Sequence, residues 1–149
     1  MTRTCGNCQV CCTLLAVPGM NKPERTRCER LCRDGCGDYG ARPEDCQGYS
    51  CSWLLDPEVP ASWRPDRLGV VFDTALEEAL VPMARGLPWV VAREVSPGSF
   101  LTPKAKKAIH AVSGSAVVFL AHWTPGTSKL GLVAPASFRE AKPLPVVAS

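Results

Sequence analysis

Nine cysteines lie within the first 51 residues of this chain, and the rest of the chain contains none. A first run has the spacing C-x2-C-x2-C-C, and five more cysteines follow at wider intervals. Thiolates are soft ligands that suit zinc and iron–sulfur clusters, and a C-x2-C turn brings two of them to one ion. The clustering predicts a metal centre, and the candidate ligands are Cys5, Cys8, Cys11, Cys12, Cys28, Cys32, Cys36, Cys46 and Cys51.

Disulfides explain this clustering less well than metal does. The cysteine count is odd, adjacent Cys11 and Cys12 are awkward in a disulfide framework, and the opening residues contain no apolar stretch typical of an export signal. Burial as small hydrophobic side chains could account for one or two cysteines, but not for four within eight residues. Metal binding by most of the nine is the interpretation that remains.

The identity of the metal is left open by the ligand type. Eight cysteines could form two closed four-thiolate zinc sites, which would lower the formal net charge from +3 to about −1. The start of the run, from Cys5 to Cys11, is also that of bacterial ferredoxins, but Leu15 stands where the fourth cysteine is expected. We expect zinc, with an iron–sulfur cluster as the alternative. Exposed, labile thiolates would instead serve redox chemistry or metal transfer.

The cysteine run and the residues after it resemble the YkgJ-like cysteine-cluster family, described as a zinc- or iron-chelating domain. The matching segments are 5–12, 27–31 and 36–46, followed by Tyr49 and Cys51, and they cover about the first third of the chain. The family also includes flagellin lysine methylase, a much larger enzyme whose activity is not carried over to this chain. The resemblance implies metal chelation by eight cysteines: Cys5, Cys8, Cys11, Cys12, Cys28, Cys36, Cys46 and Cys51.

Two positions depart from the family pattern. Gln9 stands where members carry glycine, and the nearby Gly6 could take over that turn. Cys32 has no counterpart, so we expect it to be the spare cysteine. It stays a weak ligand candidate, because residues 22–36 are expected to form a short helix or turn, and on a helix Cys28 and Cys32 would share a face.

Two further residues of the matching segments are expected beside the metal rather than on it. Tyr39 could cover the site from water. Arg42 precedes a proline that fixes the direction of the chain before Cys46. Groups in such positions orient metal ligands and tune their charge, so we expect Tyr39 and Arg42 to support the site.

The elements that must position this centre divide the chain into two parts. Residues 1–55 are expected to form an irregular cysteine-rich module nucleated by metal, because they contain few large apolar side chains. Residues 64–140 are expected to form a small α+β part, with a mostly antiparallel sheet and one or two helices, packed on the module as one unit. The expected strands cover 67–73, 89–95, 116–121 and 129–133, a helix is expected after Thr74, and another covers 103–112 with Thr102 as its N-cap.

Composition narrows the function classes further. The chain has 149 residues and is 46% hydrophobic, and it contains no apolar run near the ~18 residues that a membrane span needs. A net charge of +3 gives no strong nucleic-acid signal. The second part has no phosphate loop or nucleophile elbow, and His110 and His122 are expected to be structural.

These observations favour a cytoplasmic metal-binding protein. Closed thiolate sites leave no open position for substrate water, so the zinc would be structural, and the role would be binding of a protein partner or metal handling. We see no catalytic constellation and lean against an enzyme. The alternative is an iron–sulfur protein in electron transfer, or an accessory to radical or methyl-transfer chemistry, as the methylase relative suggests.

Overall fold

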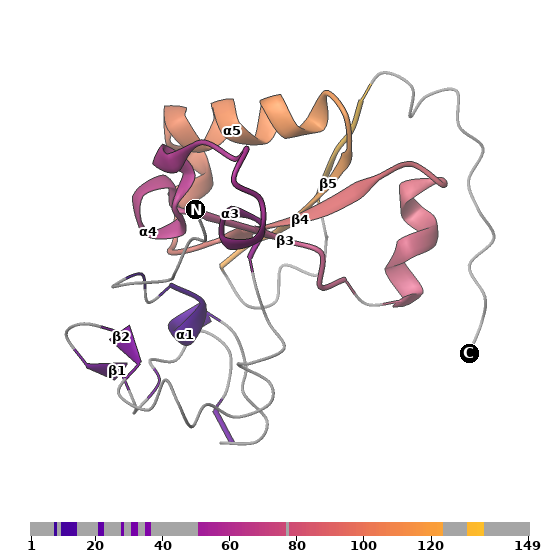
Figure 1. Cartoon of the computed structure of the whole chain (residues 1–149). Coiled ribbons are helices and arrows are strands. Elements are labelled where there is room, and N and C mark those ends of the chain that lie inside the picture. Colours follow the sequence, from indigo (N-terminus) through magenta and orange to yellow (C-terminus); the bar gives the residue numbers. More distant parts are fainter. Residues whose placement is uncertain are drawn as a thin grey trace.

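The structure is a computed structural model. It describes residues 8, 10–14, 21–22, 28, 31–32, 35–36, 51–76, 78–123 and 131–135. Within these residues, the second part of the chain contains a four-stranded sheet and its covering helices (Figure 1). The first part contributes a short helix and a two-stranded ladder. None of the described helices is long and apolar enough to cross a membrane.

The sheet of the second part is mixed. Its strands lie in the order β3 (Val70–Asp73), β4 (Trp89–Glu94), β5 (Val117–Ala121) and β6 (Gly131–Val133). The two outer pairs are antiparallel and the central β4–β5 pair is parallel. A parallel pair needs a crossover connection, and the segment with helix α5 (Pro103–Ser113) supplies it. The expected α+β architecture is therefore found in this part as a small mixed sheet with helices.

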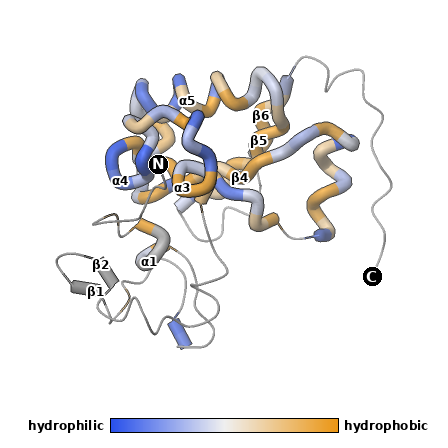
Figure 2. The backbone as a smooth tube through the Cα atoms, viewed as in Figure 1, coloured by the Kyte–Doolittle hydropathy of each residue, from blue (hydrophilic) through white to orange (hydrophobic). Residues whose placement is uncertain are grey.

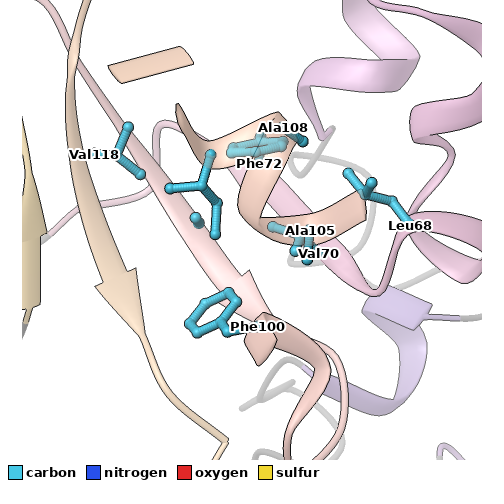
Figure 3. Packing of buried hydrophobic residues seen from close by; sticks show 9 residues of the cluster. Leu68, Val70, Phe72, Phe100, Ala105, Ala108 and Val118 are labelled. Atoms are coloured by element: carbon cyan, nitrogen blue, oxygen red, sulfur yellow. The ribbon is translucent and has the colours of Figure 1, made fainter. Parts of the chain in front are cut away.

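Both faces of the sheet are buried, which explains why its strands are nearly continuous apolar runs (Figure 2). The face toward α5 forms the larger cluster (Figure 3), made of Leu68, Val70, Phe72, Ala92, Phe100, Ala105, Ala108, Ile109 and Val118. The other face packs beneath the segment around the 3-10 helix η4 (Glu78–Ala84), with buried Ala84, Val91, Val117 and Phe119. This part therefore has its own hydrophobic core.

Helix α5 forms as its sequence predicts. The hydroxyl oxygen of Thr102 accepts a hydrogen bond from the N–H of Ala105 at 3.3 Å, and Pro103 occupies the first turn. Ala105, Ala108 and Ile109 are buried against the sheet, whereas the lysines of this helix are exposed. The helix ends at Ser113, one residue after the expected end.

The segment before β3 departs from the expectation. Strand β3 begins at Val70 and not at residue 67, because residues Pro65–Leu68 form the short helix α4. Gly69 ends α4 in the left-handed conformation, at a φ of 81°, which only glycine adopts without strain. Likewise, the 3-10 helix η4 begins only at Glu78 and contains Pro82, so the helix expected after Thr74 is not found over the described residues there.

Two short elements lead from the cysteine segment to the sheet. They are α3 (Ser52–Leu55) and the 3-10 helix η3 (Ala61–Trp63), and α3 contacts the edge strand β3. The ring of Trp63 packs on Phe72 of β3, with the ring centroids 5.7 Å apart. This connecting segment is therefore attached to the sheet.

The described residues of the first part form three elements. Helix α1 (Val10–Leu14) includes Cys11 and Cys12, and strands β1 (Leu31–Cys32) and β2 (Gly35–Cys36) pair antiparallel. Residues 22–36 were expected to form a short helix or turn, and at these strand residues the helix alternative is wrong. The argument that Cys28 and Cys32 share a helix face loses its basis. The domain boundaries stay predictions, because most of residues 1–50 lie outside the described residues.

Candidate metal centre

The structure describes the side chains of three expected ligands: Cys8, Cys28 and Cys51. None of these three is in a disulfide. Cys28 is buried, and Cys8 and Cys51 are half-buried. For Cys11, Cys12, Cys32 and Cys36 only the backbone is described, and Cys5, Cys46, Tyr39 and Arg42 lie outside the described residues.

Among the described residues of the cysteine segment, Cys8 lies near α4. The main-chain N–H groups of Val10, at the start of α1, and of Asp66, in the first turn of α4, act to lower the pKa of its thiol. Residues from segments far apart in the sequence therefore lie near this thiol. Main-chain N–H groups directed at a sulfur stabilise its negatively charged form.

The electrostatic setting of Cys8 contains opposing contributions. Burial raises the pKa of the Cys8 thiol and is the largest effect. The N–H groups of Val10 and Asp66 and the guanidinium of Arg64 act in the opposite direction, whereas the Asp66 carboxylate adds to the rise. A coordinated metal ion offsets the cost of burying a thiolate, because its positive charge lies next to the sulfur and holds the thiol deprotonated.

Arg64 and Asp66 form a forked ion pair beside Cys8. Arg64 Nε donates to Asp66 Oδ1 at 2.6 Å, and Arg64 Nη2 donates to Oδ2. The hydrogen bonds from Arg64 hold the pKa of the Asp66 carboxyl below its ordinary value. A two-bonded fork fixes the orientation of a guanidinium more firmly than a single contact. The Asp66 carboxylate raises the pKa of the Cys8 thiol more than the Arg64 guanidinium lowers it, so the charges of the pair together favour the neutral thiol.

A second basic residue lies at the other end of α1. The Lys22 side chain is 8% exposed, and its Nζ donates to the carbonyl oxygen of Thr13 at 3.1 Å. Carbonyl groups of the last helical turn lack partners within the helix and accept such bonds. Basic residues therefore lie at both ends of the segment that carries Cys8, Cys11 and Cys12.

Cys51 is attached to the sheet part through α3. Its carbonyl oxygen accepts the N–H groups of Leu54 at 3.0 Å and Leu55 at 3.1 Å, which starts the helix. Because α3 contacts β3, the backbone of Cys51 is fixed relative to the sheet. Cys8 and Cys51, near the two ends of the cysteine segment, are thus both held by the same connecting segment before β3.

The hairpin of β1 and β2 separates Cys32 from Cys36. Cys36 is paired with Leu31, and Cys32 is paired with Gly35. Successive pairs of a strand ladder belong to opposite faces. The two cysteines therefore occupy register positions on opposite faces of this ladder, and which of them is a ligand stays a prediction.

Among the described residues, no group of three or more histidine, cysteine, aspartate or glutamate residues could hold a metal ion. The full ligand set stays a prediction, because the other cysteine side chains lie outside the described part. The three described thiols fit a metal ligand by their chemistry: they are in no disulfide and are partly or fully buried.

The buried acidic residues of the sheet part have structural partners. Asp73 accepts Arg93 Nε at 2.6 Å, and its other oxygen accepts the N–H of Ala75 at 2.9 Å. The Glu94 carboxylate accepts the N–H groups of Phe100 and Trp123, each at 3.0 Å. These contacts hold loops on the sheet.

The two histidines lie apart on different elements. His110 is exposed on α5. His122, just after β5, is half-buried and meets the ring of Phe100 edge-on, with the ring centroids 5.2 Å apart. A packing contact of this kind agrees with a structural role for His122.

Sequence reasoning missed Arg64, Asp66 and Lys22. The sequence does contain a local signal for α4: Pro65 stands at the first helical position, and Asp66 places a carboxylate in the first turn. No local signal predicts that Arg64 and Asp66 lie near Cys8, because these residues are distant from Cys8 in the sequence.

Comparison of the chain with protein-family models, with curated proteins and with solved structures gave no match. The described residues define a small α+β part with a mixed four-stranded sheet, and a cysteine-rich segment precedes it in the sequence.

Proposed function

We propose that this chain is a cytoplasmic metal-binding protein whose cysteine segment binds zinc. Eight cysteines supply two closed four-thiolate sites, and the ions stabilise a segment with little apolar material of its own. Such sites have no open position for substrate water, so the zinc is structural. The protein then acts by binding a protein partner or by handling metal.

The number and spacing of the cysteines carry this proposal, because nine cysteines lie within 51 residues and begin with a C-x2-C-x2-C-C run. At Cys8, burial raises the pKa of the thiol, and the main-chain N–H groups of Val10 and Asp66 and the Arg64 guanidinium act against that rise. A bound ion holds a buried thiol deprotonated, because its positive charge lies next to the sulfur. The spacing of Cys8 and Cys11 suits the capture of one ion by both.

Native mass spectrometry of the full chain, purified without oxygen and combined with elemental analysis, tests the proposal. We expect two zinc ions per chain. Cys36→Ser should lose one ion, because it removes one of four thiolates from a site. Cys32→Ser is the matched control and should retain both ions, since Cys32 is the spare cysteine.

Other results would contradict parts of the proposal. A brown protein with iron and acid-labile sulfide would replace zinc by an iron–sulfur cluster and favour electron transfer or a role beside radical or methyl-transfer chemistry. A lost ion in Cys32→Ser would show that the spare cysteine is wrongly assigned. A reduced chain without any metal would overturn the proposal as a whole.

A further inference from the structure

We infer that this chain self-associates through two of its surfaces, which carry opposite charges. The acidic turn consists of Leu55, Asp56 and Glu58, and the basic surface consists of Arg67, Leu101, Lys104 and Lys107. The acidic turn of one copy docks on the basic surface of a second copy. This inference goes beyond the proposed function, and it does not depend on zinc binding.

Each surface contains a leucine that the fold leaves exposed. Leu55 is 69% exposed and Leu101 is 72% exposed, and among the described residues Met83, at 37%, is the only other exposed large apolar side chain. Because each leucine is more than two-thirds exposed, neither covers the other within one copy. Burial of apolar surface is favourable, so a contact between copies that covers both leucines favours association.

The acidic turn has a defined shape and charges of one sign. It follows α3, and Asp56 and Glu58 are both exposed. Asp56 Oδ1 accepts the main-chain N–H of Glu58 at 2.9 Å, which holds the turn closed. No lysine or arginine occurs from residue 43 to residue 63. The sequence around the turn therefore supplies no positive charge to its carboxylates.

The basic surface is formed where the end of α4 meets the start of α5. Lys104 Nζ donates to the carbonyl oxygen of Arg67. A Cβ added at Gly69, at the end of α4, would lie 3.2 Å from Cβ of Ser99, which begins the 3-10 helix η5 (Ser99–Leu101). Figure 1 shows α4 beside one end of α5. Arg67, Leu101 and Lys104 therefore lie in one region of the molecule.

The positive charge of this region is not balanced by the sequence around it. Lys104 lies in the first turn of α5, where the helix dipole makes a basic side chain unfavourable, and Lys107 is three residues further along the same face. No aspartate or glutamate occurs from residue 95 to residue 139, whereas alternating signs are typical of a helix face that meets only water. Carboxylates of a second copy balance this charge. The acidic turn fits better than a nucleic-acid backbone, because a leucine lies among the few cations of the surface.

Both surfaces belong to every copy, so two copies can make the same contact twice around a two-fold axis. Each contact involves only a few side chains, which places the interface among the small and transient ones. Attraction between exposed charges is screened by salt, with a Debye length of about 10 Å at 0.1 M. The association should therefore weaken as salt is added.

Sedimentation equilibrium of the full-length chain, purified without oxygen and kept reduced so that no disulfides form between copies, tests the inference. At about 0.02 M salt the average mass should rise with protein concentration above that of one chain, and at about 0.5 M salt it should return to that value. Lys104→Glu should weaken the association roughly tenfold or more, because it sets like charges against each other. Lys106→Glu is the matched control: it makes the same charge change on another side of α5, so it should keep the association.

A charge swap separates a specific contact from a general effect of net charge. Glu58→Lys alone should weaken the association, whereas the double variant Lys104→Glu, Glu58→Lys has the original net charge and should recover it, because the contact is restored with its signs exchanged. The control double variant Lys104→Glu, Glu78→Lys has the same net charge, but Glu78 lies in η4 and not in the acidic turn, so the association should stay weak. Circular dichroism checks that each variant is folded, and Lys107→Glu replaces Lys104→Glu if the latter does not fold.

A mass of one chain at every protein concentration in low salt would overturn the inference. Equal loss of association in Lys104→Glu and Lys106→Glu, or a folded charge-swap variant that does not recover, would also overturn it. Binding of a single-stranded oligonucleotide without self-association would assign the basic surface to nucleic acid and overturn it as well. Zinc content is measured separately, so a zinc-free chain that still self-associates would contradict the proposed function alone.

Discussion

Glu94 shows how a single buried side chain holds the corner of this sheet together. It lies at the end of β4 and is 5% exposed, and each of its two oxygens accepts a main-chain N–H. One N–H belongs to Phe100, before α5, and the other to Trp123, after β5. The carboxylate therefore joins the segment before α5 to the segment that follows β5, with one oxygen for each.

Glu94→Gln should destabilise the protein by about 1–3 kcal/mol, because the amide turns one acceptor into a donor that faces another N–H. Urea unfolding of the metal-loaded protein measures this change, and amide hydrogen exchange should show faster exchange at Phe100 or Trp123. Glu78→Gln is the control: Glu78 is exposed, so its substitution should change stability by less than about 0.5 kcal/mol. A Glu94 variant as stable as this control would contradict the role assigned to the carboxylate.

At the scale of elements, α5 depends on its N-cap residue, Thr102, which the sequence predicts. Thr102→Ala should cost about 1 kcal/mol, because the N–H of Ala105 loses its hydroxyl acceptor. Thr102→Ser keeps the acceptor and should cost much less. Thermal unfolding of both variants measures the difference, and equal destabilisation would mean that the methyl group of Thr102, not its hydroxyl, is what matters.

The elements that the sequence predicts best are those defined by their own residues. Helix α5 has a cap, a proline in the first turn and an apolar stripe, and the strands β4 and β5 are apolar runs of the right length. The parallel pairing of β4 with β5 could not be read locally, since it depends on how the crossover folds back. Short elements such as α4 and the β1–β2 ladder were mistaken because a few residues carry too weak a pattern.

The candidate site, too, can be predicted from the sequence only in part. Spacing alone predicts the cysteines to be ligands, because chelation by neighbouring thiolates is a local property. The effect of Asp66 and Arg64 on the pKa of Cys8 depends on tertiary structure, and the main-chain amide of Asp66 is a group that every residue except proline carries. Sequence reasoning therefore predicts the thiolates but not their surroundings.

At the scale of the whole molecule, the two parts should respond differently to loss of metal. The sheet part has buried clusters on both faces, whereas the cysteine segment depends on bound ions in the proposed function. Removal of zinc by a chelator should therefore expose residues 1–50 to protease, while a fragment from about residue 51 onward stays protected.

Limited proteolysis with mass spectrometry, before and after chelation, measures both responses. Re-addition of zinc should restore protection, and magnesium serves as the control ion because it prefers oxygen ligands. Protease resistance of residues 1–50 that is the same with and without metal would contradict the dependence of this segment on zinc.

The order of the two parts along the chain also has a consequence for biosynthesis. Ribosomes release the N-terminus first, at roughly 5–20 residues per second, so all nine cysteines emerge before the strands β3 to β6 do. On the proposed function, a growing chain can therefore capture zinc while the sheet part is still being synthesised.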